Sequence, residues 1–243
     1  MSDDSSSMKK NQHISEHPKN AFWKNPLAVI IGSSALFLFV QALSASLLVP
    51  IKDLVAPNVQ VLLFGVASVA TLFLLLSIIK RTIHASWQSI GLKLPRLNSF
   101  LEVAPSLILY FLLSFAVTSL AIKFVPGFDV EQAQDVGFKA LEQPLELLAA
   151  FITLVVLTPV FEETLFRGVL FKGLRHRVPF WLSAVITSLI FAAAHMQLNV
   201  AVDIFALSLI LCYLVERSSS IYPAILLHAL KNALAFSLLF LFK

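Results

Sequence analysis

The sequence predicts an all-α fold, a polytopic bundle of about seven transmembrane helices. The chain has 243 residues, of which 58% are hydrophobic and only 13% are charged, whereas about a quarter of an average soluble domain is charged. Its mean hydropathy is +0.86. Most apolar residues fall in runs of about 20, the length that a helix needs to cross about 30 Å of hydrocarbon. These observations indicate an integral membrane protein whose first partner is the lipid bilayer.

The N-terminal segment 1–26 is polar and rich in Ser, Asp, Lys and Asn. We expect a disordered cytoplasmic tail here rather than a cleaved signal peptide, because no small-residue cleavage site follows a short apolar region. The predicted spans are 27–49, 59–79, 100–123, 145–171, 180–198, 200–215 and 221–242. The chain then divides into the tail, a first group of transmembrane helices at 27–123 and a second group at 124–243.

Basic residues concentrate in alternate connections between these spans. The basic segments carry Lys9, Lys10, Lys19 and Lys24, then Lys80, Arg81, Lys93 and Arg96, then Lys172, Arg175 and Arg177, and finally Arg217. The positive-inside rule therefore predicts a cytoplasmic N-terminus, and seven spans then place the C-terminus outside. A short chain with a small polar tail and no organelle signal fits a bacterial inner (plasma) membrane. No basic run is long enough to predict a nucleic-acid partner.

Three polar clusters interrupt the apolar second group of helices. The first contains Glu162, Glu163 and Arg167, the second His195, and the third His228 and Asn232. Ionisable groups are costly in hydrocarbon, so each of them is by default a functional site with a partner. Glu163 and Arg167 are four residues apart and can pair along one helix face. Glu162 points about 100° away, which leaves its carboxylate free to act as a base or a ligand.

The two histidines allow more than one role. His228 and Asn232 share a helix face, so together they can donate hydrogen bonds to a developing oxyanion; alternatively, His228 is a metal ligand oriented by its neighbours. His195 ends a run of small residues that lets another helix approach closely. Counted from Trp181, however, His195 lies about 20 Å along the fifth span. To reach the carboxylates, that helix must start below the membrane surface, tilt strongly or break.

Other polar or reactive residues are predicted to be structural. Asp203 is expected to mark the outer end of the sixth span, Lys231 to snorkel or to pair, and Phe191 to pack beneath the His195 ring. The single Cys212 excludes an internal disulfide and a multi-cysteine zinc site. The chain also lacks a His-Glu-x-x-His zinc helix, a Gly-x-Ser-x-Gly nucleophile motif and a pair of intramembrane aspartates.

The order Glu-Glu-x-x-x-Arg, Phe-x-x-x-His and His-x-x-x-Asn, each on its own helix, resembles the CPBP family. This family comprises CAAX-type prenyl endopeptidases and bacteriocin-processing or immunity proteins, and is also called the Abi family. The motifs begin at Glu162, Phe191 and His228 and cover roughly residues 145–240. The resemblance implies that the last four spans form the catalytic core of a glutamate-dependent intramembrane endopeptidase.

By the same resemblance, Glu162 and His195 activate a water, while His228 and Asn232 stabilise the tetrahedral oxyanion. Glu163 and Arg167 then hold the helix geometry, and no cofactor is needed. A zinc-dependent version is chemically sound as well. In that version Glu163, His195 and His228 bind the metal ion, one position stays open, and Glu162 is the base. A Glu163 that pairs with Arg167 is a poor ligand, which favours the metal-free version.

Two other classes of function compete with a protease. A non-catalytic membrane scaffold or bacteriocin-immunity protein would use the same fold, but it has no need of every catalytic position. A proton- or metal-coupled transporter also uses carboxylate and histidine chains, but no pair of interrupted helices repeats across two halves of this chain. The expected substrate is a membrane-associated or prenylated (CAAX-like) protein or peptide precursor.

Overall fold

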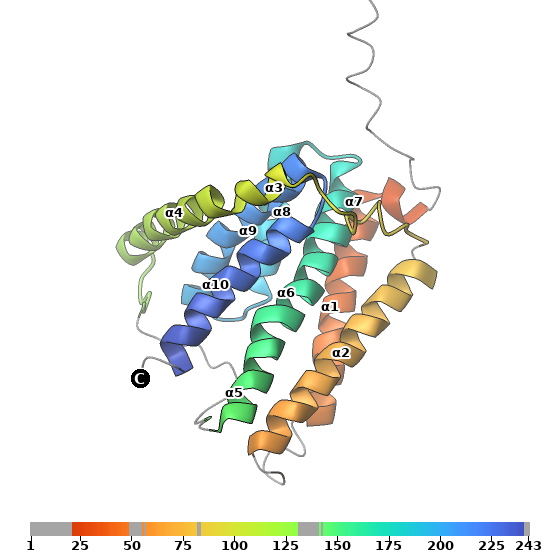
Figure 1. Cartoon of the computed structure of the whole chain (residues 1–243). Helices are drawn as coiled ribbons and strands as arrows, with labels where there is room; N and C mark the ends of the chain where they lie inside the picture. The colour runs from red at the N-terminus through yellow and green to blue at the C-terminus, as the bar shows by residue number, and fades with distance from the viewer. Residues whose placement is uncertain are drawn as a thin grey trace, which may run out of the picture.

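The computed structural model describes residues 21–48, 55, 57–81, 84–130, 141 and 143–240, so most of the predicted tail at 1–26 lies outside the described residues. Every regular element in the described part is helical (Figure 1). The elements are η2 (Ala21–Lys24), α1 (Pro26–Leu48), α2 (Pro57–Arg81), α3 (Asn98–Leu101), α4 (Val103–Phe124), α5 (Pro144–Phe151), η4 (Ile152–Leu157), α6 (Thr158–Glu163), η5 (Thr164–Phe171), α7 (Lys172–Arg175), α8 (Phe180–Ala193), α9 (Leu198–Ser218) and α10 (Tyr222–Phe240).

The helices confirm the predicted polytopic bundle. Five stretches are long and apolar enough to cross a membrane: Leu62–Arg81, Asn98–Phe124, Pro144–Arg175, Leu198–Ser218 and Tyr222–Phe240. Two shorter apolar helices, Pro26–Val40 and Phe180–Ala193, account for the remaining predicted spans. Many large apolar side chains on α1, α2 and α4 are exposed, as expected for surfaces that face lipid. The protein is therefore an integral membrane protein.

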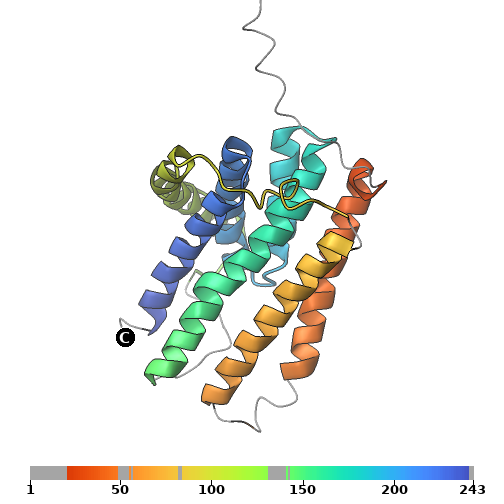
Figure 2. The same cartoon turned by 45° about the vertical axis from the view of Figure 1, so that its right-hand side comes forward.

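The bundle surrounds one long central helix, built from α5, η4, α6, η5 and α7 in succession. α1 and α2 lie on one side of it and α10 on the other, while α8 and α9 lie behind (Figures 1 and 2). α9 packs against α8, α4 and α10. α1 begins at one end of the bundle and α10 ends at the other (Figure 1). This arrangement places the three polar motifs on α6 and η5, at the end of α8, and on α10.

Two π-helical turns, η4 and η5, interrupt the central helix on either side of the glutamates. The backbone N–H groups of Thr158 and Lys172 each bond to a carbonyl five residues earlier, those of Thr153 and Arg167. The first wide turn precedes Pro159, whose ring removes one backbone donor from the helix. π turns are rare and are found mostly at functional sites. Here they change the direction in which the residues of α6 and η5 project.

The fifth predicted span, 180–198, is too long. α8 has 14 residues and ends at Ala193, and the chain turns through Met196, which adopts a left-handed φ of 56°. The helix therefore breaks, which is one of the three ways in which the fifth span was expected to bring His195 towards the carboxylates. His195 lies in the turn between α8 and α9 rather than inside a helix.

The connection between α2 and α3 is pinned to the end of the bundle where α9 ends and α10 begins. Gly91, with a φ of 84°, accepts a hydrogen bond from the Ile221 N–H at 3.0 Å. The side chain of Ile90 is fully buried. Its carbonyl lies so close to Gly168 that a Cβ there would stand 2.9 Å from the oxygen. Gly168 thus lets this connection pack directly against η5.

Candidate active site

Glu163 and Arg167 form a fully buried ion pair. The Nη1 of Arg167 donates to Oε1 of Glu163 at 3.0 Å, and both side chains are 0% exposed. The two residues are four apart across the start of η5, so the predicted pairing along one helix face is confirmed. A buried charge without its partner is strongly destabilising. Each of these side chains therefore depends on the other.

The same oxygen of Glu163 also holds His228 of α10. The Nδ1 of His228 lies 2.9 Å from Oε1 of Glu163, and the imidazole is almost completely buried. Because an ionised carboxylate only accepts hydrogen bonds, Nδ1 of His228 carries the proton in this contact. The ring orientation is then fixed, and its Nε2 faces the other glutamate.

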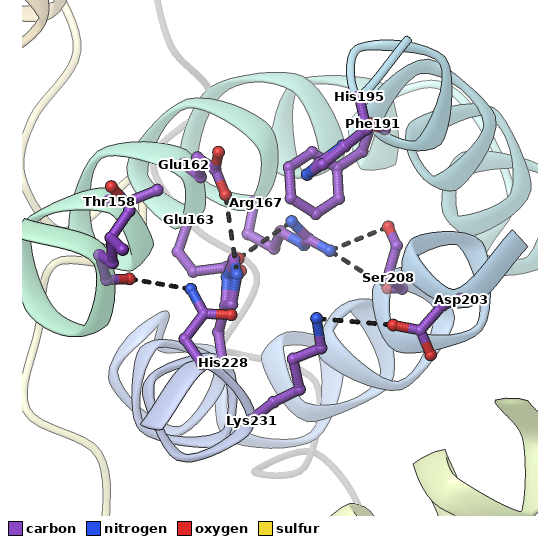
Figure 3. A network of polar contacts seen from close by, with 12 residues as sticks. Thr158, Glu162, Glu163, Arg167, Phe191, His195, Asp203, Ser208, His228 and Lys231 are labelled. Atoms are coloured by element: carbon purple, nitrogen blue, oxygen red, sulfur yellow. Dashed lines mark hydrogen bonds and ion pairs between the residues drawn. The ribbon is translucent and has the colours of Figure 1, made fainter. Parts of the chain in front are cut away.

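Glu162 is the more accessible of the two glutamates. Its side chain is 14% exposed, whereas that of Glu163 is fully buried. Its Oε2 lies 3.7 Å from Nε2 of His228. Arg167, Glu163, His228 and Glu162 therefore form a continuous chain of polar groups (Figure 3). As the sequence predicted, the adjacent glutamates differ: one is neutralised by arginine and the other is not.

Arg167 is held by two further residues. Its Nη2 donates to the Ser208 hydroxyl of α9 at 2.9 Å. Its guanidinium carbon lies 4.6 Å from the centre of the Phe191 ring, within the range of a cation–π contact. Sequence reasoning missed Ser208, because a serine among the apolar residues of α9 gives no signal of its partner.

His195 lies on the α8 side of the network. Its Nδ1 is 2.8 Å from the Phe191 carbonyl, so Nδ1 is the donor and Nε2 of the neutral ring is a free acceptor. Its ring meets that of Phe191 edge-on, with centroids 5.0 Å apart, as the sequence predicted. Figure 3 shows His195 and Phe191 across Arg167 from the two glutamates. The recorded contacts of His195 thus join it to Phe191 rather than to the carboxylates.

Asn232 turns away from His228. Its Nδ2 donates to the Leu154 carbonyl of η4 at 2.9 Å. A primary amide has two donor hydrogens, so one remains for another acceptor. The free carbonyl of a π turn thus anchors the asparagine beside the site.

The residues of the zinc alternative do not fit a metal ion. Oε1 of Glu163 already accepts hydrogen bonds from Arg167 and His228, so two of the expected ligands satisfy each other. Nowhere in the described ranges do three His, Cys, Asp or Glu side chains form a group that could hold a metal ion. The arrangement matches a carboxylate–imidazole system better than a coordination sphere.

A second polar cluster, not assigned by the sequence motifs, adjoins the site. Lys231 Nζ lies 3.5 Å from Oδ2 of Asp203, so of the two outcomes expected for Lys231, pairing is the one observed, and its partner is Asp203. The other oxygen, Oδ1 of Asp203, accepts hydrogen bonds from the Tyr110 and Ser114 hydroxyls of α4 at 2.8 and 2.5 Å. We call these four residues the Asp203 cluster. It joins α4, α9 and α10 beside the glutamate network.

Fold and site together define a class: a polytopic helical membrane protein with a buried glutamate–arginine–histidine network. The family model "Type II CAAX prenyl endopeptidase Rce1-like" matches residues 144–234, from the start of α5 to beyond Asn232. The match confirms the resemblance to the CPBP family over this segment, which contains all three motifs.

Two curated proteins are similar to the chain. An "Uncharacterized 24.3 kDa protein" of Escherichia coli is 38% identical over 88 residues, which cover 34% of this chain and 41% of that protein. The "UPF0177 protein YbdI" of Lactococcus lactis subsp. lactis (strain IL1403) is 23% identical over 134 residues, 55% of this chain and 72% of that protein. The chain thus spans about two fifths of the length of the first relative. No solved structure matches significantly.

Proposed function

We propose that the protein is an intramembrane endopeptidase that hydrolyses a peptide bond in a membrane-associated protein or peptide precursor, CAAX-like or otherwise lipidated. One observation carries the proposal. A partly accessible carboxylate, Glu162, lies beside an imidazole that a second, buried carboxylate holds in place. The match of residues 144–234 to an Rce1-like family model supports the same reaction class.

In the proposed mechanism Glu162 is the general base. It removes a proton from a water molecule, and the resulting hydroxide attacks the carbonyl carbon of the scissile bond. Nε2 of His195 assists as a second acceptor for that water. The C–N bond then breaks, and the proton held by Glu162 passes to the leaving amine. Exposure of Glu162 but not of Glu163 favours this assignment.

His228 and Asn232 are the proposed oxyanion donors. Nδ1 of His228 donates to Glu163, so Nε2 faces the reaction centre, and it donates to the oxyanion when the ring is the doubly protonated imidazolium. Asn232 keeps one amide hydrogen after its bond to Leu154. Hydrogen-bond donors that are already in position need not reorganise when negative charge develops on the oxyanion. In this proposal Glu163 and Arg167 touch no substrate; they orient His228.

The experiment is cleavage of a panel of internally quenched peptides by purified protein in detergent, with and without a farnesyl group on a cysteine. New termini are identified by mass spectrometry. We expect the wild type to cut and Glu162→Ala to lose at least a hundredfold in rate, within the usual range for a general base. Glu216→Ala is the matched control, because Glu216 forms a surface ion pair with Arg175. A wild type that cuts no peptide, or an active Glu162→Ala, overturns the proposal.

A further inference from the structure

The connection 84–97, between α2 and α3, presents large apolar side chains outward. Trp87, Leu94 and Leu97 are 39%, 86% and 80% exposed, although none of the five candidate membrane spans includes them. Exposed apolar surface of this kind is unfavourable in water and marks a contact with another apolar phase. Because the connection lies beside the ends of the spans, that phase is the lipid at the membrane interface, where tryptophan is also enriched.

Cations alternate with these apolar side chains. Lys93 and Arg96 flank Leu94, and both are exposed. Two other cations at this end of the bundle, Arg175 and Arg217, have carboxylate partners. In the described part of the chain, no ion pair includes Lys93 or Arg96. Unpaired cations beside large apolar side chains are typical of segments that lie in the lipid headgroup layer.

Two consecutive residues of the turn between α9 and α10 hold two lysines from different parts of the chain. The Ser219 carbonyl accepts a hydrogen bond at 3.4 Å from Nζ of Lys172, near the end of the central helix. The Ser220 hydroxyl donates to the backbone carbonyl of Lys93 at 2.7 Å. The two ammonium groups are close enough to repel each other. The fold therefore brings two positive charges together at one point of the membrane interface.

The nearby acidic group does not balance this pair of lysines. Glu216 is the described carboxylate that attracts Lys172, and both of its oxygens already accept hydrogen bonds from Arg175, at 3.0 and 2.7 Å. Among the described residues, no carboxylate forms an ion pair with Lys172. A phosphate group bound by Lys93 and Lys172 would supply the missing negative charge without displacing an existing ion pair.

We propose that Lys93 and Lys172 bind the phosphate of an anionic phospholipid, whose acyl chains lie against Trp87, Leu94 and Leu97. Charge and apolar surface both favour this partner. A free phosphate or an acidic peptide would meet the two lysines but leave the apolar side chains in water, whereas a phospholipid covers both. The basic connections are predicted to face the cytoplasm, where the membrane leaflet carries anionic lipids that attract Lys and Arg.

The lipid site is coupled to the helices that carry the glutamate network. A Cβ on Gly168 of η5 would stand 2.9 Å from the Ile90 carbonyl, and the Gly91 carbonyl accepts a hydrogen bond from the Ile221 N–H, just before α10. A headgroup that ties this connection to the central helix therefore holds η5 and α10 together. We expect the lipid to stabilise the fold whether or not the protein cuts peptides, so the proposal is independent of the protease function.

The test is the melting temperature of the purified protein in detergent with phosphatidylglycerol, with phosphatidylcholine of the same acyl chains, or with inorganic phosphate. We expect phosphatidylglycerol alone to raise the melting temperature, by about 5 °C at saturation. The Lys93→Gln/Lys172→Gln protein should lose this shift, and Lys93→Arg should keep it. The matched control, Lys24→Gln/Arg177→Gln, removes two exposed cations at the same end of the bundle and should also keep it.

Fluorescence gives a second readout that does not depend on thermal unfolding. Phosphatidylglycerol with brominated acyl chains should quench tryptophan emission more strongly than brominated phosphatidylcholine does. This excess should disappear in Trp87→Phe and in Lys93→Gln/Lys172→Gln.

Three results would overturn the site. The first is an equal effect of the two lipids, and the second is a shift that survives the loss of both lysines. The third is a shift that the control pair also abolishes, because that pattern indicates attraction to the whole basic surface. The same shift with inorganic phosphate would overturn the lipid as the partner.

Discussion

Oε1 of Glu163 lies 2.9 Å from Nδ1 of His228 and, at the same time, 3.0 Å from Nη1 of Arg167. One buried oxygen therefore ties the central helix to α10. The two donors, Nη1 of Arg167 and Nδ1 of His228, reach this oxygen from different helices. The imidazole therefore has little freedom to rotate. In the proposed mechanism, this contact is how Glu163, which does not meet the substrate, affects the reaction at Glu162.

Replacement of Arg167 should make the protein easier to unfold. Arg167→Met leaves the Glu163 carboxylate buried without its cation, and breaking such a pair costs about 3–5 kcal/mol. We expect a large fall in the melting temperature in detergent. Arg175→Met is the control. Its ion pair with Glu216 is 30% and 38% exposed, so about 1 kcal/mol or less is expected. Equal effects of the two substitutions would contradict the buried network.

Gly168→Ala should damage both stability and activity. The added Cβ would stand 2.9 Å from the Ile90 carbonyl, and a backbone atom cannot move away as a side chain can. We expect a loss of about 1–3 kcal/mol from overpacking and slower cleavage, because η5 also carries Arg167. In Gly65→Ala the nearest atom is the Thr153 hydroxyl at 3.3 Å. Thermal unfolding should therefore show a smaller loss of stability in that control. A Gly168→Ala protein as stable and as active as the wild type would contradict the tight contact.

Removal of metal ions should leave proteolysis unchanged. Glu163 and His228 satisfy each other, so we expect equal cleavage rates before and after incubation with a tight zinc chelator. The measurement is the rate on the same quenched peptide, with a detergent-solubilised zinc protease as a positive control for chelation. Activity that disappears with chelator and returns with added zinc would show instead that Glu163 is a zinc ligand.

The orientation of the chain can be tested by labelling cysteines. The native Cys212 is fully buried and should not react. We expect Gln88→Cys, in the basic connection after α2, to react with a membrane-impermeant maleimide only when the cytoplasmic side is open. Val130→Cys, in the connection after α4, is 51% exposed before substitution and should react from outside. The reverse pattern would contradict the predicted cytoplasmic N-terminus.

The spans and one ion pair could be predicted because their signals are local. Each span is a long apolar run, and Glu163 and Arg167 are close in any helix because they are four residues apart. The end of α8 could not be predicted. The turn at Met196 uses a residue that rarely adopts a positive φ, and no glycine or proline marks the break in the sequence.

The contacts that complete the site depend on tertiary packing. His228 meets Glu163 across 65 residues of sequence, and Ser208 meets Arg167 across 41. Nothing within either helix specifies which neighbour it will face. The π turns around the glutamates also escape prediction, because they shift the residues of one helix without changing its hydrophobicity.

The division of labour between the two adjacent glutamates is the central claim, and paired measurements on Glu162→Gln and Glu163→Gln test it most directly. Each protein is assayed for peptide cleavage and for melting temperature in the same detergent. We expect Glu162→Gln to be inactive and as stable as the wild type, and Glu163→Gln to be less active and clearly less stable. A stable but inactive Glu163→Gln, together with an active Glu162→Gln, would contradict the account.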